Sequence, residues 1–178
     1  MRKLKNSELN RHSFETYKTV SKLPYAIVLD NVRSANNIGS VFRTSDAFLV
    51  DKVILCGISC TPPNTDIHKT ALGSEDAVEW HYQADCFEAV KQLKEQGYLV
   101  YAIEQVEGSI SLENFSIDAT QKYAFVFGNE VKGVAQNVVD ICTGSIEIPQ
   151  FGTKHSLNIS VSMGVVIWDI FKKMQYGF

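Results

Sequence analysis

Three polar clusters interrupt the apolar pattern of this chain, and they hold the side chains best suited to chemistry. Arg43 carries a permanently charged, planar guanidinium of the kind that binds phosphate, and Asn37 and Asn158 offer neutral amide donors and acceptors. A single glycine-containing loop after a strand is more often a turn than a ligand cradle, so the combination carries the signal. The clusters span residues 36–43, 127–133 and 148–158.

Short apolar runs, rich in β-branched residues, lie ahead of the clusters and predict the strands that position them. Polar, helical-period segments alternate with these runs. The order therefore predicts an α/β fold with a mostly parallel sheet, helices on both faces and ligand sites at the carboxyl ends of the strands. We expect strands within residues 26–29, 52–58, 98–104, 123–130 and 144–150.

Caps and apolar spacing predict the helices between these strands. Ser34, Asn36 and Asn37 are candidate caps for a helix whose apolar face carries Ile38, Val41, Phe42, Ser45 and Phe48. The other expected helical segments are Asp85–Gln96, which Gly97 terminates, the short turn Gln136–Cys142 and the strongly apolar Leu157–Phe171.

The stretch from Cys60 to His81 contains paired prolines and predicts mostly loop until Val78 and Trp80. A loop of this length inside a compact domain is usually functional. This stretch is therefore a second candidate for a binding surface, beside the basic N-terminal segment, residues 1–22, described below.

The composition is typical of a single globular domain, with 178 residues of which 45% are hydrophobic. No apolar run approaches the roughly 20 residues of a membrane span, and the N-terminus has no apolar signal segment, so we expect a cytoplasmic protein without membrane contact. The four cysteines lack paired metal-ligand spacing, and we interpret them as small core residues rather than metal ligands or disulfides.

Positive charge is concentrated at the N-terminus. Residues 1–22 carry six basic and two acidic side chains, whereas the remainder carries 11 basic and 18 acidic ones, within a net charge of −3. Such asymmetry is typical of a nucleic-acid-binding arm on an acidic body, although a solvated N-terminal extension would give the same pattern. We divide the chain into this basic segment, 1–22, and a domain at 23–178.

Taken together, the clusters resemble the SpoU family of ribose methyltransferases, within the knotted SPOUT class. Asn37 is followed six residues later by Arg43, a strand ends in Gly-x-Glu-x-x-Gly, and Ile-Pro precedes Ser-Leu-Asn. The resemblance spans roughly residues 25–173. The residues that match the second and third motifs are Gly128, Glu130, Gly133, Ile148, Pro149, Ser156, Leu157 and Asn158.

This resemblance implies an enzyme that transfers a methyl group from S-adenosylmethionine to a ribose 2′-hydroxyl of RNA, with no metal. It also implies a C-terminal trefoil knot whose crossing forms the cofactor pocket, which the general rarity of knots would otherwise argue against. Members form homodimers whose active sites draw on both subunits, which fits the apolar last helix. The residues implied at the cofactor are Ala102, Ile103, Glu104, Gly128, Asn129, Gly133, Ile148 and Leu157.

The resemblance assigns catalysis to Arg43, although a guanidinium is a poor base, so we expect it to orient phosphate and ribose. Asn37 and Asn158 would position the ribose or a neighbouring loop, with helix capping as the alternative for Asn37. Glu130 could hold Arg43 or the substrate hydroxyl, and Ser156 could bond to the cofactor or to an asparagine. We interpret His155 as a loop residue.

Three other functions remain open at this point. An RNA-binding assembly factor would retain the pocket without the reaction, but Arg43, Glu130 and Asn158 are intact. A nucleotide-binding Rossmann protein would need a glycine fingerprint after the first strand, which is lacking. Methylation of a base is the nearest enzymatic alternative, and the motif Ser156-Leu157-Asn158 favours ribose. The chain is close to a minimal catalytic domain, which weakly favours transfer RNA over ribosomal RNA.

Overall fold

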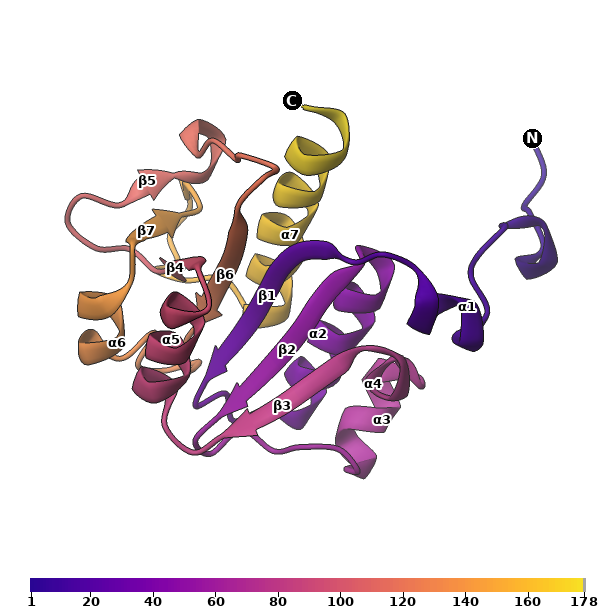
Figure 1. Ribbon diagram of the computed structural model, residues 1–178, viewed down its shortest axis with the longest axis horizontal. Coiled ribbons are helices and arrows are strands. Elements are labelled where there is room, and N and C mark those ends of the chain that lie inside the picture. The colour runs from indigo at the N-terminus through magenta and orange to yellow at the C-terminus, as the bar shows by residue number, and fades with distance from the viewer. Residues whose placement is uncertain (178) are drawn as a thin grey trace.

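Within residues 1–177, which the computed structural model describes, seven strands form one parallel sheet with helices on both faces (Figure 1). Phe178, the last residue of the expected domain, lies outside the described residues. The sheet order is β3-β2-β1-β6-β4-β7-β5, and the predicted α/β class is confirmed. The strands are β1 Leu23–Asp30, β2 Val50–Cys56, β3 Glu79–Gln83, β4 Tyr98–Ile103, β5 Ile110–Ser111, β6 Lys122–Phe127 and β7 Gly144–Glu147.

Helices connect these strands and cover the sheet on its two sides. Two short 3-10 turns, Asn6–Glu8 and Leu112–Asn114, add to them. The α-helices are α1 Phe14–Thr19, α2 Ala35–Ala47, α3 Thr65–Ala71, α4 Ser74–Ala77, α5 Cys86–Glu95, α6 Gln136–Ile141 and α7 Ile159–Tyr176.

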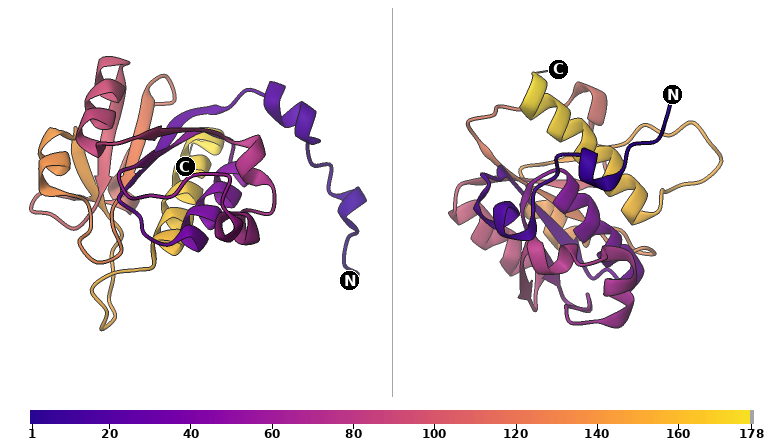
Figure 2. Two further views of the ribbon diagram at one scale, coloured as in Figure 1. Left: turned by 90° about the horizontal axis from the view of Figure 1, so that it is seen from below. Right: turned by 90° about the vertical axis from the view of Figure 1, so that its right-hand side faces the viewer.

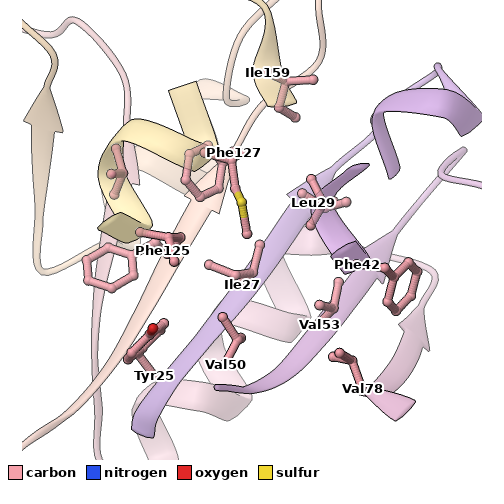
Figure 3. Close-up of a cluster of buried hydrophobic side chains, with 14 of the residues drawn as sticks. Tyr25, Ile27, Leu29, Phe42, Val50, Val53, Val78, Phe125, Phe127 and Ile159 are labelled. Atoms are coloured by element: carbon pink, nitrogen blue, oxygen red, sulfur yellow. The ribbon is translucent and has the colours of Figure 1, made fainter. Parts of the chain in front are cut away.

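Strand β1 lies inside the sheet, between β2 and the central strand β6, and its alternating side chains enter two separate cores. Ile27 and Leu29 pack with α2, α3 and α7 on one face, while Ala26 and Val28 pack with α5 and α6 on the other. Figure 3 shows Ile27 and Leu29 in the first of these cores, together with Phe42 of α2 and Ile159 of α7. Ala26, Ile27, Val28 and Leu29 are fully buried, and each large aliphatic side chain contributes about 1.5–3 kcal/mol by its burial. Because both faces are covered, the strand reads as a continuous apolar run rather than an alternating one.

The prediction that residues 60–81 are mostly loop is wrong. Asn64 caps α3 by accepting from the backbone N–H groups of Asp66 and Ile67, at 2.9 and 3.2 Å. Ile67 and Ala71 are then buried against α2. The helix approaches so closely that a Cβ at Gly39 would lie 2.3 Å from the Ile67 carbonyl oxygen. The segment is too short for its apolar period to stand out, so tertiary packing decided its structure.

Helix α7 begins two residues later and ends five residues later than the sequence predicts. It begins at Ile159 because Asn158 is its N-cap and accepts from the Ser160 N–H at 2.9 Å. It ends at Gly177, whose left-handed backbone (φ 76°) terminates the helix. Between β7 and α7 a long segment projects from the body of the molecule (Figure 2). The trefoil knot stays a prediction.

The N-terminal segment precedes β1 and extends away from the sheet (Figures 1 and 2). Its helix α1 is fixed by a capping box between Ser13 and Thr16, and Tyr17 is its one buried residue. Among the described residues, no helix is both long and apolar enough to cross a membrane. Cys56 and Cys86 are buried, as expected for core residues, whereas Cys60 and Cys142 are partly exposed.

Candidate active site

A cavity of about 720 Å³ lies at the carboxyl ends of β4, β6 and β7. Three segments at the ends of these strands give most of its lining, within residues 103–106, 127–134 and 146–159, and Gln136, Val139 and Ser162 complete it. This is the edge of a parallel sheet where ligands usually bind, and the volume is that of a site for a small molecule or cofactor.

The loop after β6 folds back on itself, and two glycines make this possible. Asn129 and Gly133 pair through two backbone hydrogen bonds of 3.0 and 2.9 Å. A Cβ on Gly128 would lie 2.0 Å from the Gly133 carbonyl carbon, and one on Gly133 would lie 2.1 Å from Oε2 of Glu104. Gly133 also has a positive φ of 68°, which disfavours any other residue.

Neighbouring side chains hold this loop in place from both sides. Glu104, at the end of β4, accepts from the Val134 N–H at 3.0 Å. Asn129 donates from Nδ2 to the Asn31 carbonyl oxygen at 2.7 Å, and the buried Asp30 accepts from the Ala135 N–H at 2.9 Å. The ends of β1, β4 and β6 are thereby joined by side-chain to backbone bonds.

Glu130 projects from this loop to the start of α2. Its carboxylate accepts from the backbone N–H groups of Arg33 and Ser34, both at 3.0 Å, and from Nδ2 of Asn37 at 3.2 Å. The helix N-terminus favours a negative charge at this point. Of the two alternatives for Glu130, the contact with Arg43 is absent from the interactions of residues 1–177.

Asn37 in turn connects α2 to the start of α7. Nδ2 of Asn158 donates to Oδ1 of Asn37 at 3.3 Å, and the Ser160 hydroxyl lies 3.4 Å from the same atom. Asn158 and Ser160 also bond to each other at the first turn of α7. One hydrogen-bonded chain therefore joins residues from all three sequence clusters at the rim of the cavity.

Burial acts to raise the pKa of Glu130, but the hydrogen bonds from Arg33, Ser34 and Asn37 outweigh it and lower the pKa below the ordinary 4.5. The carboxylate is therefore ionised at neutral pH and fully engaged in structural bonds. Such a group is a poor proton acceptor, which indicates that Glu130 holds the site together rather than acting as a base.

Arg43 lies apart from the other predicted residues. It is exposed on α2, does not line the cavity, and within the described part of the chain its guanidinium makes no hydrogen bond or ion pair. Six residues along a helix correspond to about 9 Å of rise and to a different face, so Arg43 cannot share the inward orientation of Asn37.

The remaining expected residues divide into two groups. Ala102 is fully buried in the sheet below the cavity and does not line it. The predicted residues that do line the cavity are Ile103, Glu104, Gly128, Asn129, Glu130, Gly133, Ile148, Ser156, Leu157 and Asn158.

His155, interpreted from the sequence as a loop residue, is exposed on its loop and also lines the cavity. Sequence reasoning missed Asp30, Asn31 and Ser160. A usable signal existed for the first two, because they are the polar pair directly after the first apolar strand. Ser160 gave no such signal, since its role depends on where α7 begins.

The hydrogen bonds to Glu130 predict its titration. In a carboxyl-detected NMR pH titration, we expect the pKa of Glu130 to lie below 4.5 in the wild type. In Asn37→Ala the pKa of Glu130 should rise toward 4.5, because one hydrogen-bond donor is lost. Since the folded-state pKa is depressed, the stabilisation that Glu130 provides is present above the ordinary pKa and is lost as pH falls through the folded value. Asn36→Ala is the matched control and should change nothing. A pKa at or above 4.5 in the wild type would contradict this bonding.

Comparison with known proteins gives the family. The model of the SpoU rRNA Methylase family matches residues 24–168. A tRNA (guanosine(18)-2′-O)-methyltransferase from Thermus thermophilus is 29% identical over 163 residues, which cover 92% of this chain and 82% of that protein. The 23S rRNA (guanosine-2′-O-)-methyltransferase RlmB from Neisseria meningitidis is 28% identical over 88% of this chain and 61% of its own length.

The fold agrees with solved structures. The AdoMet-bound rRNA methyltransferase from Sinorhizobium meliloti superposes with a TM-score of 0.79 at 22% identity, over 89% of this chain and 60% of that one. The chain thus spans about six tenths of the Neisseria and Sinorhizobium proteins. Because the family model covers most of its length, including all three clusters around the cavity, this chain belongs to the SpoU rRNA methylase family.

Proposed function

We propose that this chain transfers a methyl group from S-adenosylmethionine to a ribose 2′-hydroxyl of RNA. The observation that carries the proposal is the cavity at the strand ends, whose rim joins Asn37, Glu130 and Asn158 in one hydrogen-bonded chain. These are the residues that match the family motifs. Because the chain spans only part of several relatives, their activities are extended to it as a proposal.

The cavity suits S-adenosylmethionine in size and in chemistry. Its volume of about 720 Å³ holds a molecule of this kind, and Ile103, Ile148 and Leu157 give it apolar walls that suit an adenine ring. The close backbone packing at Gly128 leaves no room for a side chain at this position of the cavity lining. When bound, the cofactor supplies a methyl group carried on a positively charged sulfur. The Sinorhizobium protein, similar in fold, was solved with AdoMet bound.

The chain's own residues would align the methyl acceptor and bind the adjoining phosphate. A methyl acceptor must be aligned within a fraction of an ångström, and the amides of Asn37 and Asn158, fixed by each other and by Glu130, provide rigid polar groups at the rim. Arg43 has a free guanidinium, which suits a substrate phosphate adjoining the ribose. Ser156 lies in the cavity lining and is free to bond to either ligand.

A second copy of the chain would complete this site. Leu157, Val161, Val165 and Trp168 are 40–53% exposed, and their spacing of four, four and three residues places them on one side of the chain around α7. Leu157 also lines the cavity, so the stripe adjoins the site. Helix α2, which carries Arg43, packs beside α7. Arg43 does not line the cavity of its own subunit, and in a dimer formed through α7 it could contact the substrate at the cavity of the other subunit. We therefore propose a homodimer with shared sites.

The N-terminal segment is proposed as part of the RNA-binding surface. Arg2 is paired with Glu8 at 2.7 Å, and the Lys22 ammonium donates to the Tyr17 carbonyl oxygen, so these two cations have partners. The remaining basic residues of the segment are exposed and extend from the body of the domain: Lys3, Lys5, Arg11 and Lys18. Such exposed cations can neutralise phosphates.

We favour transfer RNA over ribosomal RNA as substrate. The support is the alignment along 82% of a tRNA methyltransferase, against 61% of the rRNA enzyme from Neisseria. With an RNA substrate of this class, the reaction would take place in the cytoplasm.

The reaction is tested by calorimetric titration of S-adenosylmethionine beside a labelled-methyl assay on total RNA from a strain lacking the gene. We expect Arg43→Ala to lose about a hundredfold or more in methyl transfer while keeping the wild-type cofactor affinity, because Arg43 lies outside the cavity. Arg43→Lys should retain only part of the rate, since it keeps the charge but loses the fork of donors. Near-normal transfer by Arg43→Ala would refute its role.

The homodimer is tested by sedimentation at micromolar concentration. Val165→Glu places a charge in the centre of the exposed stripe, so we expect a monomer that retains its thermal stability and cofactor binding but loses methyl transfer. Leu72→Glu is the control, because Leu72 is 64% exposed but lies directly after α3, outside the stripe. A wild-type monomer that is fully active would rule out the shared site.

A further inference from the structure

The loop between β7 and α7 presents an aromatic side chain that the fold does not use. Phe151 is 99% exposed, and it stands next to Gly152 in a run where every residue from 151 to 158 is exposed. The loop projects from the body of the domain in both views of Figure 2. A phenylalanine stabilises a folded chain only when its ring is buried, so Phe151 contributes nothing to the stability of the folded subunit.

Phe151 sits at the entrance to the cavity rather than inside it. Gln150 and His155, on either side of it in the loop, both line the cavity, whereas Phe151 does not. Phe151 is therefore outside the lining of the space that suits the cofactor, while its loop forms part of the wall. A ligand that extends out of the cavity past this loop could reach the ring.

Exposed positive charge lies on the segments next to the cavity. Lys132 lines it from the loop after β6, Lys154 lies on the loop of Phe151, and Arg33 lies just before α2, where its backbone N–H donates to Glu130. All three are exposed, and in residues 1–177 none of their charged groups forms an ion pair. An exposed aromatic ring among cations is the combination that binds single-stranded nucleic acid, because rings stack on bases while cations contact phosphates.

We propose that Phe151 stacks on an unpaired RNA base next to the ribose that enters the cavity, with Lys132 and Lys154 on the flanking phosphates. The inference rests on the proposed RNA methylation and adds a positioning residue to it. It also narrows the substrate to a nucleotide in a single-stranded loop or bulge, because a base inside a duplex offers no free face to the ring.

The first test uses a single-stranded RNA of about twelve nucleotides that carries the fluorescent base 2-aminopurine, within the usual site size of stacking proteins. Wild-type protein should quench the probe by stacking. Phe151→Ala and Phe151→Leu should both lose this quenching and weaken binding by about fivefold to a hundredfold, whereas Phe151→Trp should retain both. The leucine variant separates stacking from simple apolar contact. Leu72→Ala, at 64% exposure, is the matched control and should behave as wild type.

The second test measures methyl transfer to RNA from the deletion strain. Phe151→Ala should raise KM for RNA by a similar factor, with cofactor affinity by calorimetry and the sedimentation coefficient unchanged. Wild-type quenching and KM in Phe151→Ala would overturn the inference. A loss of cofactor affinity would instead make Phe151 a cover for the adenine, and altered sedimentation a subunit contact, and either result would refute stacking on RNA. If the wild type methylates no RNA at all, the proposed reaction fails, while the quenching still reports on Phe151.

Discussion

The site depends on one close approach of backbone to backbone, in the loop after β6. Gly128 meets the Gly133 peptide, and Gly133 meets the carboxylate of Glu104, at distances where a Cβ would lie 2.0–2.1 Å from its neighbour. This approach closes the loop through the Asn129–Gly133 pair and sets one wall of the cavity. It also fixes the position from which Glu130 reaches α2. A side chain at either glycine would displace this loop, and with it the cavity wall and Glu130.

Hydrogen bonds connect Glu130 to the starts of α2 and α7 and so fix the other parts of the site. The carboxylate caps the start of α2, Asn37 binds Asn158, and Asn158 caps α7, so residues separated by up to 121 positions in sequence become neighbours. Each such bond is worth only about 1 kcal/mol, but together they hold three loops in a single geometry. A site fixed in this way can orient a substrate, while the residues proposed to contact RNA, Arg43 and Phe151, are exposed outside it.

The sequence was sufficient for the class of fold, and most of the site residues predicted from it line the cavity, because strand ends and glycine loops have strong local signals. It failed for α3, where burial of Ile67 against Gly39 decides the structure and no local pattern reveals it. Of the two partners that it suggested for Glu130, Arg43 or the substrate hydroxyl, the contact with Arg43 is not formed among the described residues. The helical rotation between Asn37 and Arg43 separates them, and a motif shows spacing but not which face of a helix each residue occupies.

The central claim is that the glycine-dependent closure of the loop after β6 builds the cofactor cavity. Calorimetric titration of S-adenosylmethionine into Gly133→Ala tests it most directly, with Gly152→Ala as control, since a Cβ on Gly152 would meet nothing within 4 Å. Strain at a positive φ and the clash with Glu104 together should weaken cofactor binding by about tenfold or more in Gly133→Ala, while Gly152→Ala binds as wild type. Wild-type affinity in a folded Gly133→Ala protein would contradict the account.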